Sequence, residues 1–417
     1  MNVYKNSFAI SGLGIFFIFS ILFSLTAFSP TLSVYFIILF LVFCNFPENN
    51  SAHGLLVLLV FTWVIFNALD VVSFENFILA SDDFSSYYNN YVNFQMNGFY
   101  SEAFFEFGYG EIALPLINYL SSLIIDGYEP YKLKLIYSVL QSFGLIGCCI
   151  SIAKYYNLSL KQRYLLIAVV IAFFKSLVGI QLSRQCFSSI FIVLSIFSYN
   201  RSKKISFFLI SFLFHSSAII LYPLTVFLFK KRTKRDFLLT VISALGLYLF
   251  FTIAYSILRD SIINIPILNK LDYALRMISE PDKLRQSVIT SLLLMIYLTP
   301  LILICFYSKK QSYFKFNILI IFTFLIFFST FPGVNNRIFL TQLYLFLGVY
   351  YYLIMFHGFN TYNLYHRLFV ALCFTFLFVQ SHYGNEGRRF SNFDINPFFY
   401  MQTLDHKEFE INRGALE

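Results

Sequence analysis

The sequence is short of charge. Charged residues make up 12% of the chain, about half of the roughly 25% that is usual in soluble domains. Apolar stretches of about 20 residues stand in their place, and a helix of that length crosses a hydrocarbon core about 30 Å thick. We therefore expect an all-α polytopic integral membrane protein with about 11–13 membrane segments. The regular stretches are Phe8–Phe28, Thr31–Phe46, Gly54–Val72, Leu133–Ala153, Tyr164–Ile180, Leu182–Tyr199, Phe237–Ile257, Val288–Tyr307, Phe316–Phe331, Ile338–Phe356 and Leu368–Ser381.

Several kinds of site are also missing from the sequence. The six cysteines fall in apolar stretches without Cys-x-x-Cys spacing, which argues against a disulfide framework or a metal cluster. The chain has no Walker loop, no Gly-x-Gly-x-x-Gly with a ribose-binding acid, no His-Glu-x-x-His and no Asp-x-Asp. The net charge of +9 fits basic cytoplasmic loops rather than a nucleic-acid partner. We therefore expect no cofactor, no metal and no nucleic acid.

Positive charge is absent from a long N-terminal interval. No Lys or Arg occurs between Lys5 and Lys132, whereas ten acidic residues lie there. Basic clusters follow later, and the positive-inside bias assigns those clusters to the cytoplasm and residues 73–131 to the outside. We expect one transmembrane domain over residues 1–417, with amphipathic or re-entrant helices in the extracytoplasmic segment 73–131 and a polar tail at 385–417.

Two less regular stretches break the alternation of sides. Glu111–Asp126 has extracytoplasmic flanks at both ends, so it is not a simple span, and Pro115 and Asn118 suit a broken helix. Ile205–Phe229 has basic flanks at both ends. It is either a re-entrant hairpin with His215 near its tip, lining a cavity, or an ordinary span that violates the charge bias. Both arrangements agree with the sequence.

Carboxylates and aromatic residues alternate in the extracytoplasmic segment. In SDDFSSYYNNY, Asp82 is followed by Asp83, Tyr87 and Tyr91, and the last three share one face if the stretch is helical. The stretch EAFFEFGYGE follows, with acidic and tyrosine residues at Glu102, Glu106, Tyr109 and Glu111. Carboxylates accept hydrogen bonds from sugar hydroxyls and aromatic rings pack on sugar faces, so this pattern favours a sugar site. An interfacial helix with aromatic residues at headgroup level is the alternative.

Arginine opens two of the apolar spans. Arg184 and Gln185 begin one span, and Arg337 begins another after a Pro-Gly pair and two asparagines. A membrane arginine is usually paired or functional, and its planar fork matches phosphate oxygens. The pattern favours a diphosphate clamp. The alternative is a snorkelling arginine, whose aliphatic part lies in the apolar region while its guanidinium extends to the membrane interface.

His215 lies within the apolar stretch SFLFHSSAIILYP. A lone histidine in a soluble core is most often a packing residue, but an ionisable residue inside a membrane segment points to function. Imidazole titrates near neutral pH, which suits acceptance of a proton from a sugar hydroxyl. His215 is therefore a candidate general base.

These motifs together resemble the EpsG-like family of polysaccharide polymerases. The resemblance rests on Leu182–Gln185, the basic Asn200–Lys204, then FHSSA from Phe214 with Pro223, and on DDFSSYYNNY, NRIFL and NPFFY elsewhere. Ser183 and Ser217 are mild departures, and the tail beyond Tyr400 is longer than the family pattern. The resemblance implies a GT-C-like helical fold and a Wzy-type O-antigen or exopolysaccharide polymerase in the bacterial inner membrane, working at its periplasmic face. Its substrates are donor and acceptor oligosaccharides linked to undecaprenyl diphosphate, and a chain-length regulator is a further partner.

The residues and the resemblance lead to one mechanism. Arg184, Gln185 and Arg337 bind the donor diphosphate, so the leaving group needs no metal. His215 or an acid, first Asp83 and then Glu102 or Glu106, accepts the proton, and Asp82, Tyr87, Tyr91 and Tyr109 bind sugar. A flippase for the same lipid-linked unit is the competing hypothesis, although no repeat relates the two halves of the chain. A membrane O-acyltransferase is a third.

Overall fold

The computed structural model describes most of the chain. The described residues are 8–9, 12–45, 49–69, 83–105, 111–125, 127, 130–230, 232–258, 281–307, 314–330, 339–356 and 364–383. Every apolar stretch expected from the sequence contains a helix, so the prediction of an all-α fold is confirmed. A two-residue parallel pair, β1 (Phe8–Ala9) with β2 (Cys44–Asn45), is the extended exception within these ranges. The chain forms two compact units, one of which holds residues 1–222, 344–352 and 359–417.

Three N-terminal helices begin the first unit. They are α1 (Gly12–Phe28), α2 (Pro30–Phe43) and α3 (Asn49–Leu69), and each packs on the other two. A small hydroxyl cluster links them, because Thr26 Oγ1 lies 2.9 Å from Ser33 Oγ and 3.2 Å from Thr62 Oγ1. Such bonds hold helices together where the surroundings are apolar.

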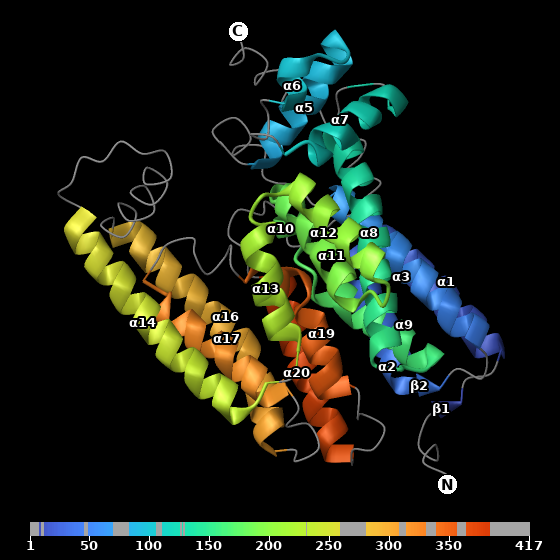
Figure 1. The fold of residues 1–417 in the computed structure, drawn as a ribbon. Coiled ribbons are helices and arrows are strands. Elements are labelled where there is room, and N and C mark those ends of the chain that lie inside the picture. The colour runs from blue at the N-terminus through green and yellow to red at the C-terminus, as the bar shows by residue number, and fades with distance from the viewer. Residues whose placement is uncertain are drawn as a thin grey trace. The chain divides into compact units, whose positions relative to one another are not determined.

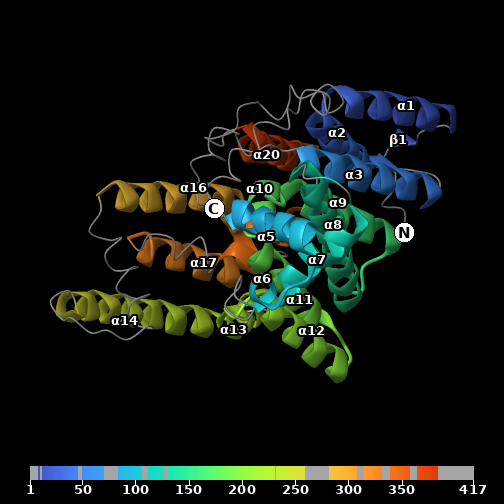
Figure 2. The same ribbon diagram turned by 90° about the horizontal axis from the view of Figure 1, so that it is seen from above.

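Three short helices and one long helix follow. The short ones are α5 (Asp83–Asn97), α6 (Ser101–Phe105) and α7 (Ala113–Ile124), and α5 lies alongside α7 (Figure 2). They lie together near the beginning of the long α8 (Pro130–Tyr155), as Figure 1 shows. α7 is too short to cross a bilayer, as the charge pattern predicts. The helix is not broken at Pro115, because proline is tolerated in the first turn, where its missing N–H has no helical partner.

The next apolar stretch contains a break that the sequence does not reveal. The single span expected over Tyr164–Ile180 is instead α9 (Leu160–Phe173) followed by α10 (Ser176–Gln181). Phe174 and Lys175 are extended, and the Lys175 N–H donates to the Tyr344 carbonyl at 2.9 Å. This bond replaces the helical one, so the chain turns at this point.

Helices α11 and α12 form an antiparallel pair that positions the site. α11 (Ser183–Phe197) packs on α8 and on α12 (Arg201–Phe214). Asn200 begins α12, because its side chain accepts a hydrogen bond from Ser202 N. At the same end of the pair, the Tyr199 hydroxyl donates to the Lys154 carbonyl at the end of α8. The basic residues Lys154, Arg201, Lys203 and Lys204 therefore gather at one end, and Arg184 and His215 lie at the other.

The helix after this pair, α13 (Ala218–Phe229), contains Pro223, and the boundary between the two units falls between Tyr222 and Pro223. A buried segment returns to the first unit near the C-terminus. This part, residues 344–352, contains the end of the π-helical η3 (Leu340–Leu345), all of α19 (Leu347–Tyr351) and the first residue of the π-helical η4 (Tyr352–Phe356). The last described helix of the unit is α20 (Leu364–Tyr383). α19 crosses α9 at Gly348, where an added Cβ would lie 2.5 Å from the Val169 carbonyl oxygen. Glycine is required by this close approach.

The second unit holds residues 223–343 and 353–358. In it α17 (Lys315–Phe327) lies between α14 (Lys234–Leu258) and α16 (Pro281–Tyr307), as Figure 2 shows. The loop before α14 is fixed by Asn317, whose amide donates to the carbonyls of Leu228 and Lys230.

Two described helical stretches, Lys132–Tyr155 and Leu284–Phe306, are long and apolar enough to cross a membrane by length and composition. Several shorter apolar helices of 10–17 residues accompany them.

Candidate functional site

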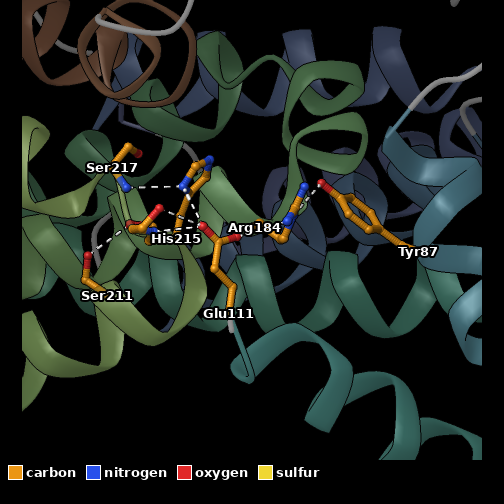
Figure 3. A network of polar contacts seen from close by, with 8 residues as sticks. Tyr87, Glu111, Arg184, Ser211, His215 and Ser217 are labelled. Carbon is orange, nitrogen blue, oxygen red and sulfur yellow. Dashed lines mark hydrogen bonds and ion pairs between the residues drawn. The ribbon is translucent and has the colours of Figure 1, made fainter. Parts of the chain in front are cut away.

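One carboxylate collects donors from separate parts of the first unit. Glu111 lies immediately before α7 and is buried. Its Oε2 accepts a hydrogen bond from Arg184 at 3.0 Å, and its Oε1 lies 3.1 Å from Nδ1 of His215. The backbone N–H and the hydroxyl of Ser216 also donate to Oε1, at 2.9 and 3.0 Å. Figure 3 shows these groups converging on the carboxylate.

Arg184 lies in the first turn of α11 and connects Glu111 with α5. Its Nε lies 3.4 Å from the Tyr87 hydroxyl, and its guanidinium lies over the Tyr87 ring at 5.6 Å. The side chain is 23% exposed, whereas that of Glu111 is 10% exposed. The buried carboxylate therefore lies beneath a guanidinium that can still be reached from outside.

His215 occupies the turn between α12 and α13. Its backbone is extended, with φ −157° and ψ 124°, which ends α12, while its N–H still bonds the Ser211 carbonyl. The chain then folds back, and the Phe208 ring of α12 packs edge-on against the Tyr222 ring of α13 at 5.0 Å. The sequence allowed a hairpin with His215 near its tip, and the structure has that local geometry.

The ionisation of Glu111 follows from its surroundings. Burial raises the pKa of this carboxyl, but hydrogen bonds from His215 and the Ser216 amide, together with the charges of His215 and Arg184, outweigh burial. The pKa is lowered from the ordinary 4.5 to about 2. Glu111 is therefore a carboxylate at neutral pH and a poor proton acceptor.

A second, neutral cluster fixes the positions of the helices around the site. The Asn118 side-chain amide donates to the Tyr87 carbonyl at 3.1 Å and to Oδ1 of Asn90 at 2.9 Å, and its Oδ1 accepts from the Tyr137 hydroxyl. These bonds join α7 to α5 and α8. They keep α5, which carries Tyr87, next to α7, which follows Glu111, so the two residues stay close to each other.

The structure gives two predicted sugar-binding tyrosines buried positions. The Tyr87 ring is almost fully buried and its hydroxyl faces Arg184. Tyr91 is also buried, and its hydroxyl donates to the Gly127 carbonyl at 3.0 Å and accepts from Gln95. In this structure Tyr91 holds α5 against the end of α7 rather than presenting its ring to a sugar.

The structure describes only some of the residues predicted to bind diphosphate. Arg184 lies at the site, and Gln185 is buried in the same turn of α11. Asp82, Glu106, Tyr109 and Arg337 lie outside the described residues, as does the tail at 385–417, and for Asp83 and Glu102 only the backbone is described, in α5 and α6.

Glu111 is one of the acids of its sequence stretch, but it was not among the predicted site residues. The sequence does contain a signal, because Glu111 is the acid of EAFFEFGYGE that is nearest in sequence to the apolar stretch of α7. Ser216 was not predicted either. One of its two hydrogen bonds to Glu111 comes from the backbone N–H, which every residue type except proline would supply.

The arrangement can perform two kinds of chemistry. A partly exposed guanidinium can bind an anion, and a partly exposed imidazole (29%) can accept a proton. Within the described ranges, no group of three or more His, Cys, Asp or Glu is placed to hold a metal ion.

Comparison of the chain with known proteins finds no matching family model, no matching curated protein and no matching solved structure.

Proposed function

We propose that the chain is a polytopic protein of the bacterial inner membrane with a GT-C-like fold. Exposed apolar side chains support this proposal in addition to the two long apolar helices. On α1, the side chains of Phe16, Phe17, Ile21, Phe23 and Phe28 are all more than half exposed. Apolar surface on this scale is rare on water-soluble monomers and is expected where lipid is the solvent.

The proposed activity is polymerisation of lipid-linked repeat units. In this reaction a growing glycan leaves undecaprenyl diphosphate and joins a sugar hydroxyl of a new lipid-linked unit. The observation that carries the proposal is the convergence of Arg184 and His215 on Glu111, at the end of the α11–α12 pair opposite the basic Asn200–Lys204 turn. Under the positive-inside bias, that end faces the periplasm.

Arg184 would bind the donor diphosphate and stabilise the charge of the leaving group. Its guanidinium bonds Glu111 and faces Tyr87, and the side chain stays 23% exposed, so phosphate oxygens can approach it from outside. Gln185 and Arg337 remain proposed partners in this clamp. A positive charge fixed beside the leaving group lowers the barrier because it need not reorganise during reaction.

His215 is the general base that we favour over Asp83, Glu102 and Glu106. His215 and Arg184, the proposed phosphate-binding residue, both contact the Glu111 carboxylate. A base must be within reach of the hydroxyl that attacks the anomeric carbon, and a shared counter-ion keeps the two side chains in one site.

The proposal is tested by the surface glycan of strains that carry variant chains. A strain lacking the protein should produce lipopolysaccharide with a core and a single repeat on a gel. Complementation with Arg184→Ala should leave this single-repeat product, whereas the matched control Arg201→Ala, at the opposite end of the helix pair, should restore long chains. Normal chain length with Arg184→Ala contradicts the clamp. A null strain without any repeat indicates a flippase, and full ladders of altered mass indicate an acyltransferase.

A further inference from the structure

The two ring nitrogens of His215 lie in different surroundings. Nδ1 lies 3.1 Å from the Glu111 carboxylate. Nε2 makes no hydrogen bond with any residue that the structure describes. Figure 3 shows the second nitrogen pointing away from the carboxylate. The ring is therefore held at one nitrogen and open at the other.

The partner of Nδ1 decides which nitrogen carries the proton of the neutral ring. An ionised carboxylate only accepts hydrogen bonds, so Nδ1 must donate to Glu111. The Ser217 N–H also faces Nδ1, at 3.3 Å, but a nitrogen that carries a proton does not accept this bond. The contact with Glu111 is shorter and charge-assisted, and it determines the tautomer. Nε2 is then left with a free lone pair.

Glu111 is itself fixed in place. Its Oε1 receives the N–H and the hydroxyl of Ser216, the residue next to His215, and its Oε2 receives Arg184. The Glu111 carboxylate thus contacts both the side chain of His215 and the backbone N–H of Ser216. His215 cannot turn its ring over without giving up this contact.

We infer that Glu111 is a positioning residue, which holds His215 in the tautomer whose Nε2 is unprotonated and makes Nε2 the atom that receives the acceptor proton. The inference rests on the proposed function. In the reaction, the acceptor hydroxyl oxygen forms a bond to the donor anomeric carbon, and the bond from that carbon to the diphosphate oxygen breaks. The electron pair leaves with the diphosphate and the hydroxyl proton passes to Nε2. The resulting imidazolium faces the Glu111 carboxylate and later releases its proton to water.

Glutamine cannot replace Glu111 in this role. Every group that the structure describes in contact with the carboxylate is a donor: Arg184, His215 and the N–H and hydroxyl of Ser216. An amide has one accepting atom and one donating group, so Glu111→Gln must set a donor against a donor on one side. If the amide N–H faces His215, the ring adopts the opposite tautomer and Nε2 becomes protonated.

The kinetic test uses the full-length protein in nanodiscs with lipid-linked repeat units extracted from a strain that cannot polymerise them. Glu111→Gln should lower kcat by about 100-fold or more, the range of general-base effects, whatever change in the KM for donor follows from the altered contact with Arg184. Glu111→Asp, which keeps the charge, should recover part of the rate. His215→Ala should be as slow as Glu111→Gln, and the double variant should be no slower. Ser122→Ala is the matched control: Ser122 lies on α7, which follows Glu111, and among the described residues its hydroxyl bonds the Tyr119 carbonyl alone.

A wild-type kcat in Glu111→Gln overturns the inference. A lower KM for donor with an unchanged kcat also overturns it, because Glu111 would then only compete with phosphate for Arg184. If the wild-type protein elongates nothing, the proposed function fails, and this result is distinct from an active wild type with an equally active Glu111→Gln.

A second measurement needs neither activity nor a variant at Glu111. The ¹⁵N spectrum of histidine-labelled protein in lipid at pH 8 distinguishes the two neutral tautomers, and the His215 signals are those that disappear in His215→Asn. We expect proton on Nδ1 and none on Nε2. A ring protonated on Nε2 overturns the inference even if Glu111→Gln does not fold.

Discussion

Two polar clusters meet at Tyr87 and differ in charge and in exposure. The Asn118 cluster is neutral and fully buried, and its amide bonds the Tyr87 carbonyl, Asn90 and Tyr137. The Glu111 cluster is charged, and Arg184 and His215 are about a quarter exposed. Both clusters hold α7, yet only the charged one reaches the surface.

The difference in charge and exposure suggests different roles for the two clusters, with the Asn118 cluster fixing helix packing and the Glu111 cluster contacting substrate in the proposed function. A buried neutral network whose members bond one another specifies how helices pack, and nothing in it is available to a substrate. Charges are expensive to hold in an apolar protein and are kept where they act. We therefore expect substitutions in the Asn118 cluster to change stability and substitutions in the Glu111 cluster to change activity.

Asn118→Ala should have the largest effect on stability. It removes three buried hydrogen bonds, to the Tyr87 carbonyl, Asn90 and Tyr137, at a cost of about 3 kcal/mol in the free energy of unfolding. Denaturation in detergent measures the loss. Ser122→Ala, one turn away, should stay within about 0.5 kcal/mol of wild type. Equal stabilities for the two variants would mean that the Asn118 cluster is not the support described above.

Arg184→Ala should have a smaller effect on stability and a larger one on activity. It removes one charged hydrogen bond from Glu111, which keeps three other donors, so we expect a loss of about 2 kcal/mol. Arg201→Ala, an exposed residue at the opposite end of α11 and α12, should cost less than about 0.5 kcal/mol. If Arg201→Ala proved as costly as Arg184→Ala, the contrast between paired and exposed arginines would be wrong.

The charged cluster should also make stability depend on pH. The folded pKa of Glu111, about 2, lies below the ordinary 4.5, so its stabilising contribution is complete above about pH 4.5 and falls as the pH drops towards 2. Linkage gives a loss of about 0.8 kcal/mol between pH 7 and pH 4 from this group. The difference between the wild-type and Glu111→Gln denaturation curves at the two pH values measures it. A constant difference would remove Glu111 as the source.

Tyr87→Phe should have the smallest effect, because it changes the residue where the clusters meet without breaking either. It removes a long hydrogen bond to Arg184 Nε and keeps the ring beneath the guanidinium and the backbone carbonyl that Asn118 binds. We expect a loss of about 0.5 kcal/mol. A loss as large as that of Asn118→Ala would show that the two clusters act as one.

The sequence predicted the helices well because long apolar stretches have few alternatives. It predicted one span over Tyr164–Ile180 and missed the break at Phe174–Lys175, since that break depends on a bond to Tyr344, which is distant in the sequence. It also expected Pro115 to interrupt α7, but the helix begins so close to this residue that the proline is accommodated.

The site was predicted in part. Arg184 and His215 stood out because each is an ionisable residue among apolar ones, and the structure brings both to Glu111. The choice among several acids of one segment could not be made from the sequence, because it depends on how α5 and α7 pack through Asn118. The same packing buries Tyr91, and the helical spacing of SDDFSSYYNNY does not show which of its residues are buried.

The length of α11 has a consequence for depth in the membrane. Its 15 residues, at about 1.5 Å each, extend about 22 Å, which is less than the roughly 30 Å of a hydrocarbon core. In the proposed orientation the Asn200–Lys204 turn marks the cytoplasmic boundary, so Arg184 stands about 8 Å below the outer one, and any tilt lowers it further. Under the proposed function, the diphosphate of the donor lipid would then have to move below the interface to reach the guanidinium, and the acceptor sugar would have to reach the same depth.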